Sequence, residues 1–472
     1  MELTLLHVRG KSIGYARYGT YLHQELSKMG VDVYDKLEAP TDPNENERLI
    51  EQAEGFESDL GPRRHKQTNI VAWVSVPTHA RGWWKGQTPI ISSMWEADTL
   101  PESFRENLHE FDTVIVPSAQ NVELFSRYHD NVKLVPLGVD PADWHYVERK
   151  APTTTFDFLI GGSGERKGVD LAVKAFRKLW GEEGSWGDGP IPTLTMKSPK
   201  PSDLYGARVY RVQGKLSAAD EISLYEQAHC YLQPSRGEGF GLQPLQAMAQ
   251  GIPTILTDAH GHAGFAHLGY GVKAAKSKAS YFIYGDAGDW WEPDLDELCE
   301  RMQFVYYNYA EACAKAKVSA EIIARDWTWR NCAESFVDAI GRERLELPYE
   351  GTNEWVVPES RLYRVRLLTA WQADVAGTQY QFEKGVDYWE PADIKRIMFE
   401  AQVLDPECTE NAFTRDGVFI DNGLSEEQVV KSGAYRARHS FCDTCGQKLN
   451  SGTTKADELF AEMEKMPEGA VT

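Results

Sequence analysis

The stretch that decides the fold is PSRGEGFGLQPLQAMAQGIPTILTD, residues 234–258. Its turn carries glycines at three alternate positions, Gly237, Gly239 and Gly241. Because glycine has no Cβ, the backbone here turns tightly and approaches a ligand closely. A helix is expected immediately afterwards, with Pro244 near its first turn and Gly251 ending it. The free N–H groups and positive dipole end of such a helix form a site for phosphate.

A carboxylate stands inside this turn, because Glu238 lies between two of the glycines. It is placed to accept hydrogen bonds from sugar hydroxyls. The alternative is a structural strand-to-helix turn that carries a solvated glutamate.

The rest of the chain to about residue 340 alternates short apolar runs with amphipathic stretches. Strands alternating with helices predict an α/β fold with parallel, doubly wound sheets. A polar, turn-rich break near residues 147–155 separates two such units. We therefore expect two Rossmann-like lobes facing a cleft, over residues 1–150 and 151–345, with ligands at the carboxyl ends of the strands.

The segment EGFGLQPLQAMAQGIP resembles the donor-binding motif of the retaining family 4 glycosyltransferases, which have the GT-B fold. The resemblance implies that Glu238 lies near the sugar of a nucleotide-sugar donor. The family's second glutamate, which holds the ribose hydroxyls, is Gln246 here, an uncharged hydrogen-bonding group. The resemblance also implies backbone contacts to the donor from neighbouring positions, namely Gly239, Phe240, Gly241 and Leu242.

A second segment, LIGGSGERKGVDLAVKAF at residues 159–176, resembles the strand, glycine-rich turn (Gly161, Gly162) and helix that open the donor lobe of that family. Lys167 occupies the position of the lysine that contacts the diphosphate, where a fixed cation stabilises the charge on the leaving group. Taken alone, it would be a solvated lysine at the start of a helix. The family's arginine is replaced by Gly161, and Arg166 or Arg236 is expected to substitute for it.

The first 150 residues resemble the acceptor lobe of the same family. Gly14 matches its glycine loop, and Glu96 in SMWEADTLPESF is a candidate for positioning or deprotonating the acceptor hydroxyl. The alternative for Glu96 is a surface or helix-capping residue. His79 is a second candidate for the acceptor role, and the adjoining Trp83 and Trp84 would stack on a sugar face.

The resemblance implies a retaining glycosyltransferase that moves a hexose from a UDP- or GDP-linked donor to an acceptor hydroxyl, without a catalytic metal. The acceptor would be a virion protein, modified DNA or a glycan. A catalytically degenerate GT-B scaffold that binds nucleotide sugars or glycans is the alternative, motivated by Gln246 and Gly161. Sugar-nucleotide epimerisation, or phosphorolysis with pyridoxal phosphate, is the least favoured activity for a chain with this two-lobed fold.

Composition excludes several classes of protein. The 472 residues are 42% hydrophobic and 26% charged, which is typical of a folded chain and not of a fibrous or disordered one. No apolar run approaches the roughly 20 residues of a membrane span, and no signal peptide is apparent. The net charge of −21 makes passive binding to nucleic acid improbable. Seven scattered cysteines favour a reducing compartment, so a cytoplasmic location is expected.

The last third of the chain departs from this pattern. Residues 346–360 are rich in Pro, Gly and acids and predict a linker, and residues 361–472 predict a small α+β appendage. Within it YRVRLL reads as a strand, and helices are expected after Pro391 and at Asp457–Met466. The appendage resembles modules of phage-encoded proteins, which implies an infected bacterial cytoplasm. Its expected role is acceptor recognition or assembly, and the alternative is a folded element that adds stability. A half zinc site is expected from His439 and the C-x-x-C motif of Cys442 and Cys445, with Cys408 as the candidate fourth ligand. Free thiols in a tail and a site completed by a partner are the alternatives.

Overall fold

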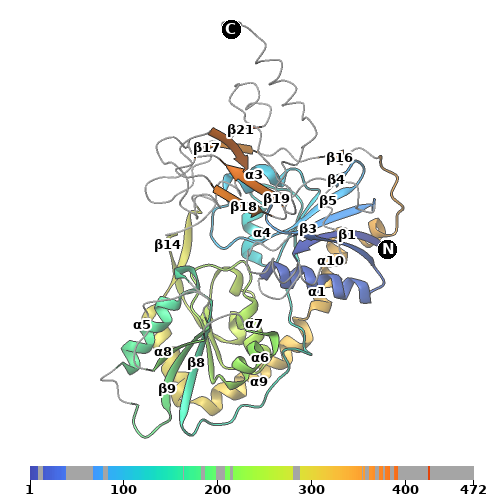
Figure 1. The fold of residues 1–472 in the computed structure, drawn as a ribbon. Coiled ribbons are helices and arrows are strands. Elements are labelled where there is room, and N and C mark those ends of the chain that lie inside the picture. Colours follow the sequence, from blue (N-terminus) through green and yellow to red (C-terminus); the bar gives the residue numbers. More distant parts are fainter. Residues whose placement is uncertain are drawn as a thin grey trace.

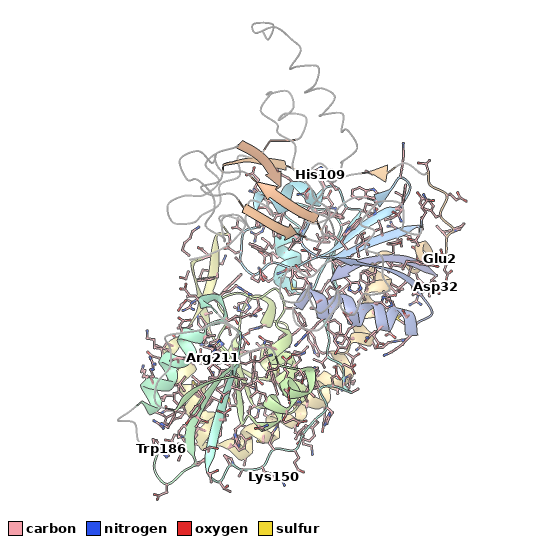
Figure 2. All side chains as sticks on the ribbon, in the orientation of Figure 1. Glu2, Asp32, His109, Lys150, Trp186 and Arg211 are labelled. Carbon is pink, nitrogen blue, oxygen red and sulfur yellow. The ribbon has the colours of Figure 1, made fainter. Side chains whose placement is uncertain are left out.

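The computed structural model places two lobes side by side, with strands of the C-terminal third beyond the first (Figure 1). It describes residues 1–8, 14–38, 67–77, 83–162, 164–181, 186–197, 208–212, 216–279 and 287–352. Beyond these it describes short strand segments at 355–356, 361–366, 371–375, 378–382, 387–391 and 424–425. Figure 2 labels Glu2, Asp32 and His109 on the N-terminal lobe, and Lys150, Trp186 and Arg211 on the second.

The N-terminal lobe is built on a six-stranded parallel sheet of order β2-β1-β3-β5-β6-β7. Its strands are β1 (Glu2–Val8), β2 (Asp32–Glu38), β3 (Ile70–Val74), β5 (Thr88–Ser92), β6 (Thr113–Val116) and β7 (Val132–Leu134). Its helices are α1 (Gly14–Lys28), α3 (Glu102–Leu108) and α4 (Ala119–Phe125). Strands β3 and β6 are buried along their whole length, as expected for strands covered on both faces.

The second lobe repeats this design with the parallel order β10-β9-β8-β11-β12-β13. Its strands are β8 (Thr155–Gly161), β9 (Ile191–Lys197), β10 (Val209–Val212), β11 (Cys230–Gln233), β12 (Thr254–Thr257) and β13 (Tyr270–Val272). Its helices are α5 (Val169–Trp180), α6 (Ala218–Gln227), α7 (Leu242–Ala249) and α8 (Leu295–Tyr307). The predicted class, a GT-B fold of two Rossmann-like lobes, is confirmed.

The two lobes are joined by helices α9 (Tyr309–Asp326) and α10 (Trp329–Ile340), and α10 packs on α1 of the first lobe. At the crossing, Val139 pairs with Thr328. A Cβ on Gly138 would lie 2.2 Å from the Thr328 carbonyl carbon, so only glycine fits there. Trp329 then stacks on Tyr21 with ring centroids 5.1 Å apart. One continuous apolar core therefore contains residues of both lobes and of α10.

A hairpin between the lobes was not foreseen from the sequence. Strands β14 (Ala274–Lys278) and β15 (Asp289–Pro293) pair in antiparallel fashion and form a sheet separate from that of the second lobe. Ala287, at its far end, is buried in the core of the N-terminal lobe. The hairpin is therefore shared by both lobes.

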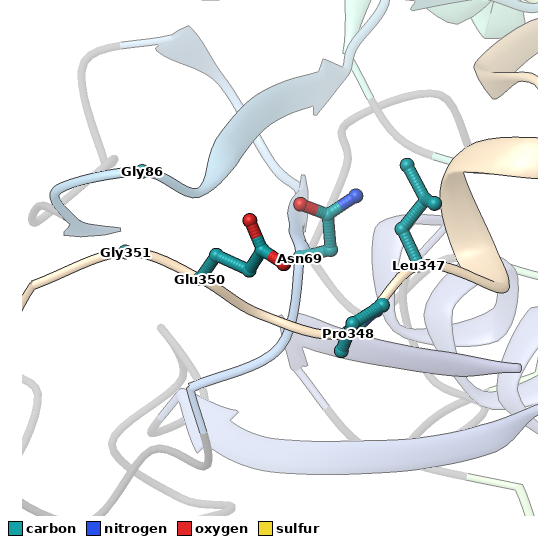
Figure 3. A pocket seen from close by; sticks show the side chains of 6 residues that line it. All are labelled: Asn69, Gly86, Leu347, Pro348, Glu350 and Gly351. Atoms are coloured by element: carbon teal, nitrogen blue, oxygen red, sulfur yellow. The ribbon is translucent and has the colours of Figure 1, made fainter.

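The described residues of the segment expected as a linker, 346–352 and 355–356, contact the N-terminal lobe. Strand β16 (Trp355–Val356) pairs with β4 (Trp83–Trp84), and Tyr349 donates a hydrogen bond to the Lys85 carbonyl at 2.6 Å. This segment, together with Asn69 and Gly86, lines a pocket of about 360 Å³ (Figure 3).

The structure corrects the expectation that Trp83 and Trp84 would stack on a sugar. Both are buried, and the Trp83 ring packs against Trp73 and Phe111 at 5.9 and 6.4 Å between centroids. Two large adjacent apolar side chains gain more from burial in the core of the lobe than from exposure in the cleft.

Strands are described in the appendage, where β17 (Arg361–Arg366) overlaps the predicted YRVRLL strand at residues 363–366. It pairs with β20 (Asp387–Pro391) and β21 (Leu424–Ser425), while β18 (Trp371–Val375) pairs with β19 (Thr378–Phe382). The helices expected after Pro391 and at Asp457–Met466 lie outside the described residues. Among the helices described, none has the length and apolar character required to cross a membrane.

The stack of Trp329 on Tyr21 yields a prediction for stability. Trp329→Ala should lower the free energy of unfolding by about 3–5 kcal/mol, because it opens a cavity where α10 meets α1. Tyr307→Ala, on a 60% exposed side chain of α8, is the control and should change it by less than about 0.5 kcal/mol. Equal effects of the two changes in denaturant titrations would contradict the assigned role of α10.

Candidate active site

The second sheet reverses its strand order between β8 and β11, because the chain proceeds outward from β8 on one side and from β11 on the other. In open parallel sheets, ligands bind at the carboxyl ends of the strands at such a switch point. The loop after β8 carries Arg166 and Lys167, and the loop after β11 carries Glu238. The residues predicted from the two motifs therefore meet at this crevice.

Their side chains form a compact cluster of alternating charge. Lys167 Nζ donates to Glu238 Oε1 at 2.6 Å, and Arg166 Nη1 lies 3.5 Å from Glu238 Oε2. The same Arg166 nitrogen lies 3.6 Å from Glu96 Oε1, which comes from the N-terminal lobe. Two cations thus face two carboxylates across the contact between the lobes. The exposed fraction of the Arg166 and Glu96 side chains is 30% and 28%, so solvent reaches one side of the cluster.

Burial and charge act against each other on these groups. Burial would raise the pKa of Glu238, but the adjacent Lys167 and Arg166 cations hold it well below the usual carboxyl range. Burial and the neighbouring Arg166 lower the pKa of Lys167, and the Glu238 carboxylate offsets only part of this. Glu238 is therefore a fixed anion, and its charge keeps the two cations in place.

A chain of hydrogen bonds beneath the cluster orients Glu238. Ser235 Oγ donates to Glu238 Oε1 at 2.9 Å and itself accepts from Gln233 Nε2 at 2.7 Å. Gln233 Oε1 in turn accepts from the buried Tyr231 hydroxyl at 3.0 Å. The chain runs along β11, so the strand fixes the direction in which the carboxylate points.

The glycine turn lies directly against the N-terminal lobe. A Cβ on Gly237 would lie 2.1 Å from the Glu96 carbonyl oxygen, and one on Gly239 would lie 2.6 Å from Met94 Cβ. The loop that carries Glu96 is held by Asn121, whose side chain bonds both the N–H and the carbonyl of Trp95, at 2.7 and 2.9 Å. These glycines permit contact between the two lobes.

No side chain caps helix α7, because its N-cap is Gly241 with φ +112°. Among the described residues no side chain caps the first N–H groups of this helix, and such groups at a helix N-terminus are available to an anion. Together with Lys167 and Arg166 they form a positive environment suited to a diphosphate.

The position of the missing family arginine is occupied by other side chains. A Cβ on Gly161 would lie 2.7 Å from Gln243 Nε2 and 2.8 Å from the Tyr231 hydroxyl oxygen, so a longer side chain has no room. A Cβ on Gly162 would similarly lie 2.9 Å from Lys167 Cγ. Of the two expected substitutes, the structure brings only Arg166 into the cluster.

The expectation that Arg236 contacts the diphosphate is corrected by its side-chain contacts. Its guanidinium is 5% exposed and is bound by the carboxylates of Asp170 and Glu292. These partners hold its donors away from the Lys167–Glu238 pair.

A second polar cluster, near the end of β9, also joins the lobes. Arg17, on α1, donates to Gln246 Oε1 at 3.1 Å and to Glu221 Oε2 at 2.7 Å. Lys197, at the end of β9, donates to the other oxygen of Glu221. A buried carboxylate is therefore present beside Gln246, although it is supplied by α6.

The remaining predicted positions divide into three groups. The Phe240 side chain packs on Phe265 and Trp327, and so contributes its backbone alone. Gly14 begins α1 with open space where a Cβ would be, and Leu242 begins α7 and packs on the apolar core. The residues outside the described part of the chain are His79, Cys408, His439, Cys442 and Cys445.

The sequence did not point to Arg17, Glu221 or Lys197, or to the buried histidines His260 and His262. His262 lies against Gly241, and within the described residues neither of its ring nitrogens has a partner in hydrogen-bond geometry. Burial lowers its pKa well below the ordinary value. Gln246 is the one signal that could have led to Glu221, since a charge missing from a motif suggests that another element supplies it.

Two facing Rossmann-like lobes, with a cluster of cations and carboxylates at the switch point of the second, define a GT-B protein. Residues 118–336 match the family model described as "Family 4 Glycosyltransferase in conflict systems". Over these residues, a little under half of the chain, the protein is similar to the family 4 glycosyltransferases.

Individual relatives have low sequence identity to this chain. The protein named "Putative glycosyltransferase ORF313" of Acidianus filamentous virus 1 is 25% identical over 210 residues, which are 42% of this chain and 62% of that protein. The glycogen synthase of Mycobacterium tuberculosis is 26% identical over 241 residues, 48% of this chain and 53% of the relative. The chain thus spans little more than half the length of these relatives. Among solved structures, sucrose-phosphate synthase of Thermosynechococcus elongatus is 17% identical, with a TM-score of 0.49 over 72% of this chain and 98% of that one.

The depressed pKa of Glu238 predicts how stability depends on pH. A carboxyl whose pKa is lowered by folding stabilises the protein above its unfolded pKa of about 4.3, and this contribution is lost as the pH falls toward the folded value. From pH 4.5 to 3, wild-type unfolding free energy should therefore fall more steeply than that of Glu238→Gln, by up to about 1.4 kcal/mol per pH unit. Glu334→Gln, an exposed ion-pair partner on α10, serves as the control. Parallel pH profiles for wild type and Glu238→Gln would contradict the assigned ion pairs.

Proposed function

We propose that this protein is a retaining glycosyltransferase that transfers a hexose from a UDP- or GDP-linked donor to an acceptor hydroxyl. The observation that carries the proposal is the cluster of Lys167, Arg166 and Glu238 at the uncapped N-terminus of α7. The match of residues 118–336 to the family 4 glycosyltransferase model supports the same class of reaction.

On the donor side, the diphosphate would lie at the N-terminus of α7 beside Lys167 and Arg166. The Lys167 ammonium has three N–H donors and uses one on Glu238, which leaves others for phosphate oxygens. As the bond between sugar and phosphate lengthens, charge builds on the diphosphate, and these fixed cations stabilise it. Glu238 would then accept hydrogen bonds from hydroxyls of the sugar.

On the acceptor side, Glu96 reaches the same cluster from the opposite lobe. In a retaining transfer the acceptor attacks from the face on which the diphosphate departs, so its hydroxyl must lie near the cations. The partly exposed Glu96 carboxylate is placed to orient that hydroxyl. We propose three acceptor classes for testing: a virion protein, modified DNA and a glycan.

The nucleoside would lie toward the second cluster. Carboxylates commonly hold ribose hydroxyls beside the diphosphate site of such folds. Gln246 has no charge, but Glu221 lies within reach of the same Arg17 guanidinium. We therefore propose that Glu221 and Gln246 together bind the ribose.

A second candidate function is donor binding without transfer, and Gln246 is the observation that favours it. Turnover of a labelled nucleotide sugar separates the two functions. Binding of UDP or GDP without any turnover, across a panel of donors and the three acceptor classes, would support the scaffold.

Substitutions of Lys167 and Glu238 test the charged cluster. Lys167→Ala should lower donor turnover by at least about 100-fold, since removing one group that stabilises the charge developing in the transition state has this effect in enzymes. Glu238→Ala should do the same, while both variants keep the wild-type circular dichroism spectrum. The measurement is release of nucleoside diphosphate from a panel of UDP- and GDP-sugars. Full turnover by both folded variants would refute the proposal.

Substitutions of Glu221 and Gln246, which both bond Arg17, test the proposed ribose site. Glu221→Gln should weaken binding of the matching ribonucleoside diphosphate about tenfold, in line with loss of a charged hydrogen bond. The double variant Glu221→Gln with Gln246→Glu restores a carboxylate next to Arg17 and should recover much of the affinity. Calorimetry with the 2′,3′-dideoxy analogue is the control, because its affinity should not respond to either change. Unchanged affinity of Glu221→Gln for the ribonucleotide would remove Glu221 from the site.

A further inference from the structure

Arg236 is the most extensively bonded side chain near the site, although it does not enter the cluster. Its Nη1 and Nη2 atoms donate to the two oxygens of Asp170, each at 2.8 Å. Nη2 also donates to Glu292 Oε1 at 2.9 Å, and Nη1 donates to the Glu165 carbonyl at 2.5 Å. Its planar fork thus joins α5, β15 and the turn that follows β8.

The backbone around Arg236 makes the same connections. Its N–H donates to the carbonyl of Arg166 at 2.7 Å, and its carbonyl accepts from the Trp291 N–H at 2.8 Å. The turn that carries both cations is therefore attached on one side to the loop of Glu238. The hairpin β14–β15 is attached to the other side of that loop, through the Trp291 N–H.

The hairpin reaches the N-terminal lobe at Asp98. The Lys276 ammonium lies 2.7 Å from one carboxylate oxygen of Asp98, and the Asp289 N–H donates to the other at 2.8 Å. The Asp98 N–H donates back to the Asp289 carbonyl at 2.9 Å. Gly288 fits only as glycine, because its Cβ would lie 2.3 Å from the Asp98 carboxylate.

We infer that Arg236 is a positioning residue, and that hairpin β14–β15 ties its placement to contact between the lobes. The inference rests on the proposed glycosyl transfer. When the hairpin is bonded to Asp98, Glu292 holds the Arg236 fork, and the fork bonds the Glu165 carbonyl, next to Arg166. The cations then lie where the diphosphate requires them.

The rate of transfer depends on how closely Lys167 and Arg166 keep to the positions that the diphosphate requires. Electrostatic stabilisation of a leaving group depends on donors placed before the reaction begins, and a displacement of about 1 Å can cost about 100-fold in rate. Arg236→Gln removes the fork while leaving Lys167, Arg166 and Glu238 unchanged. Because Asp170 and Glu292 are about 40% exposed, water can solvate them once the arginine is removed, and the variant should fold.

The kinetic test compares Arg236→Gln and Arg236→Lys with wild type, using the donor that wild type turns over. We expect kcat to fall about 100-fold in Arg236→Gln, with KM for the donor changed less than about threefold. Arg236→Lys keeps a cation without the fork and should recover only part of the rate. Arg330→Gln, which removes an exposed ion pair on α10, is the control and should leave both constants unchanged.

Hydrogen exchange tests the hairpin without depending on activity. Amides of residues 164–170 should exchange at least about tenfold faster in Arg236→Gln. Lys276→Met and Asp98→Ala, which alter the far end of the hairpin, should also accelerate exchange there.

The outcomes are distinguishable. A wild-type kcat in folded Arg236→Gln, or a loss confined to KM, overturns the positioning role. Wild-type exchange at 164–170 in both Lys276→Met and Asp98→Ala overturns the role of the hairpin. If wild type turns over no nucleotide sugar, the proposed function fails, and the exchange experiment still decides whether Arg236 and the hairpin hold this turn.

Discussion

The ion pair between Lys167 and Glu238 joins the ends of strands β8 and β11, and the rest of the site is arranged around it. Removing a carboxylate and an ammonium from water is costly, and removing one partner of a buried pair leaves an uncompensated charge. Here the cost is reduced because Arg166 and Glu96 complete a balanced set of two cations and two carboxylates. The switch point is therefore charged but internally neutral, with one side open to solvent.

The glycines of the motif have a role in the protein's own packing. At Gly237 and Gly239 the space that a Cβ would occupy is filled by Glu96 and Met94 of the other lobe, and at Gly241 it is filled by His262. Substitution at the first two positions would push the lobes apart before it affected any ligand. A sequence pattern typical of close approach to a donor thus also reports close approach of the N-terminal lobe.

Periodicity predicted the elements well, because strands and helices that face a core repeat with fixed spacing. Helix α5 begins inside the segment 159–176, from which a strand, a turn and a helix were predicted. Lys167 and Glu238 meet because parallel strands bring the loops at their carboxyl ends to the same edge of the sheet. Side-chain partners across long sequence separations were not predictable. Arg236 was expected at the diphosphate because it adjoins the motif, yet its partner Glu292 lies 56 residues away in an unforeseen hairpin. Likewise, Arg17 and Glu221 are 204 positions apart.

The acidic chain can accommodate an anionic donor because the relevant charges act over short distances. A net charge of −21 repels an approaching nucleotide, but charges more than about 8 Å away in solvent are largely screened at physiological salt. Inside the crevice, Lys167 and Arg166 are held within hydrogen-bond or ion-pair range of Glu238, so a diphosphate meets cations that are already oriented. Contacts between the lobes flank this position, Arg17 with Glu221 on one side and Asp98 with the hairpin on the other. Separating the lobes would break both contacts, and the orientation of the cations therefore depends on keeping the lobes together.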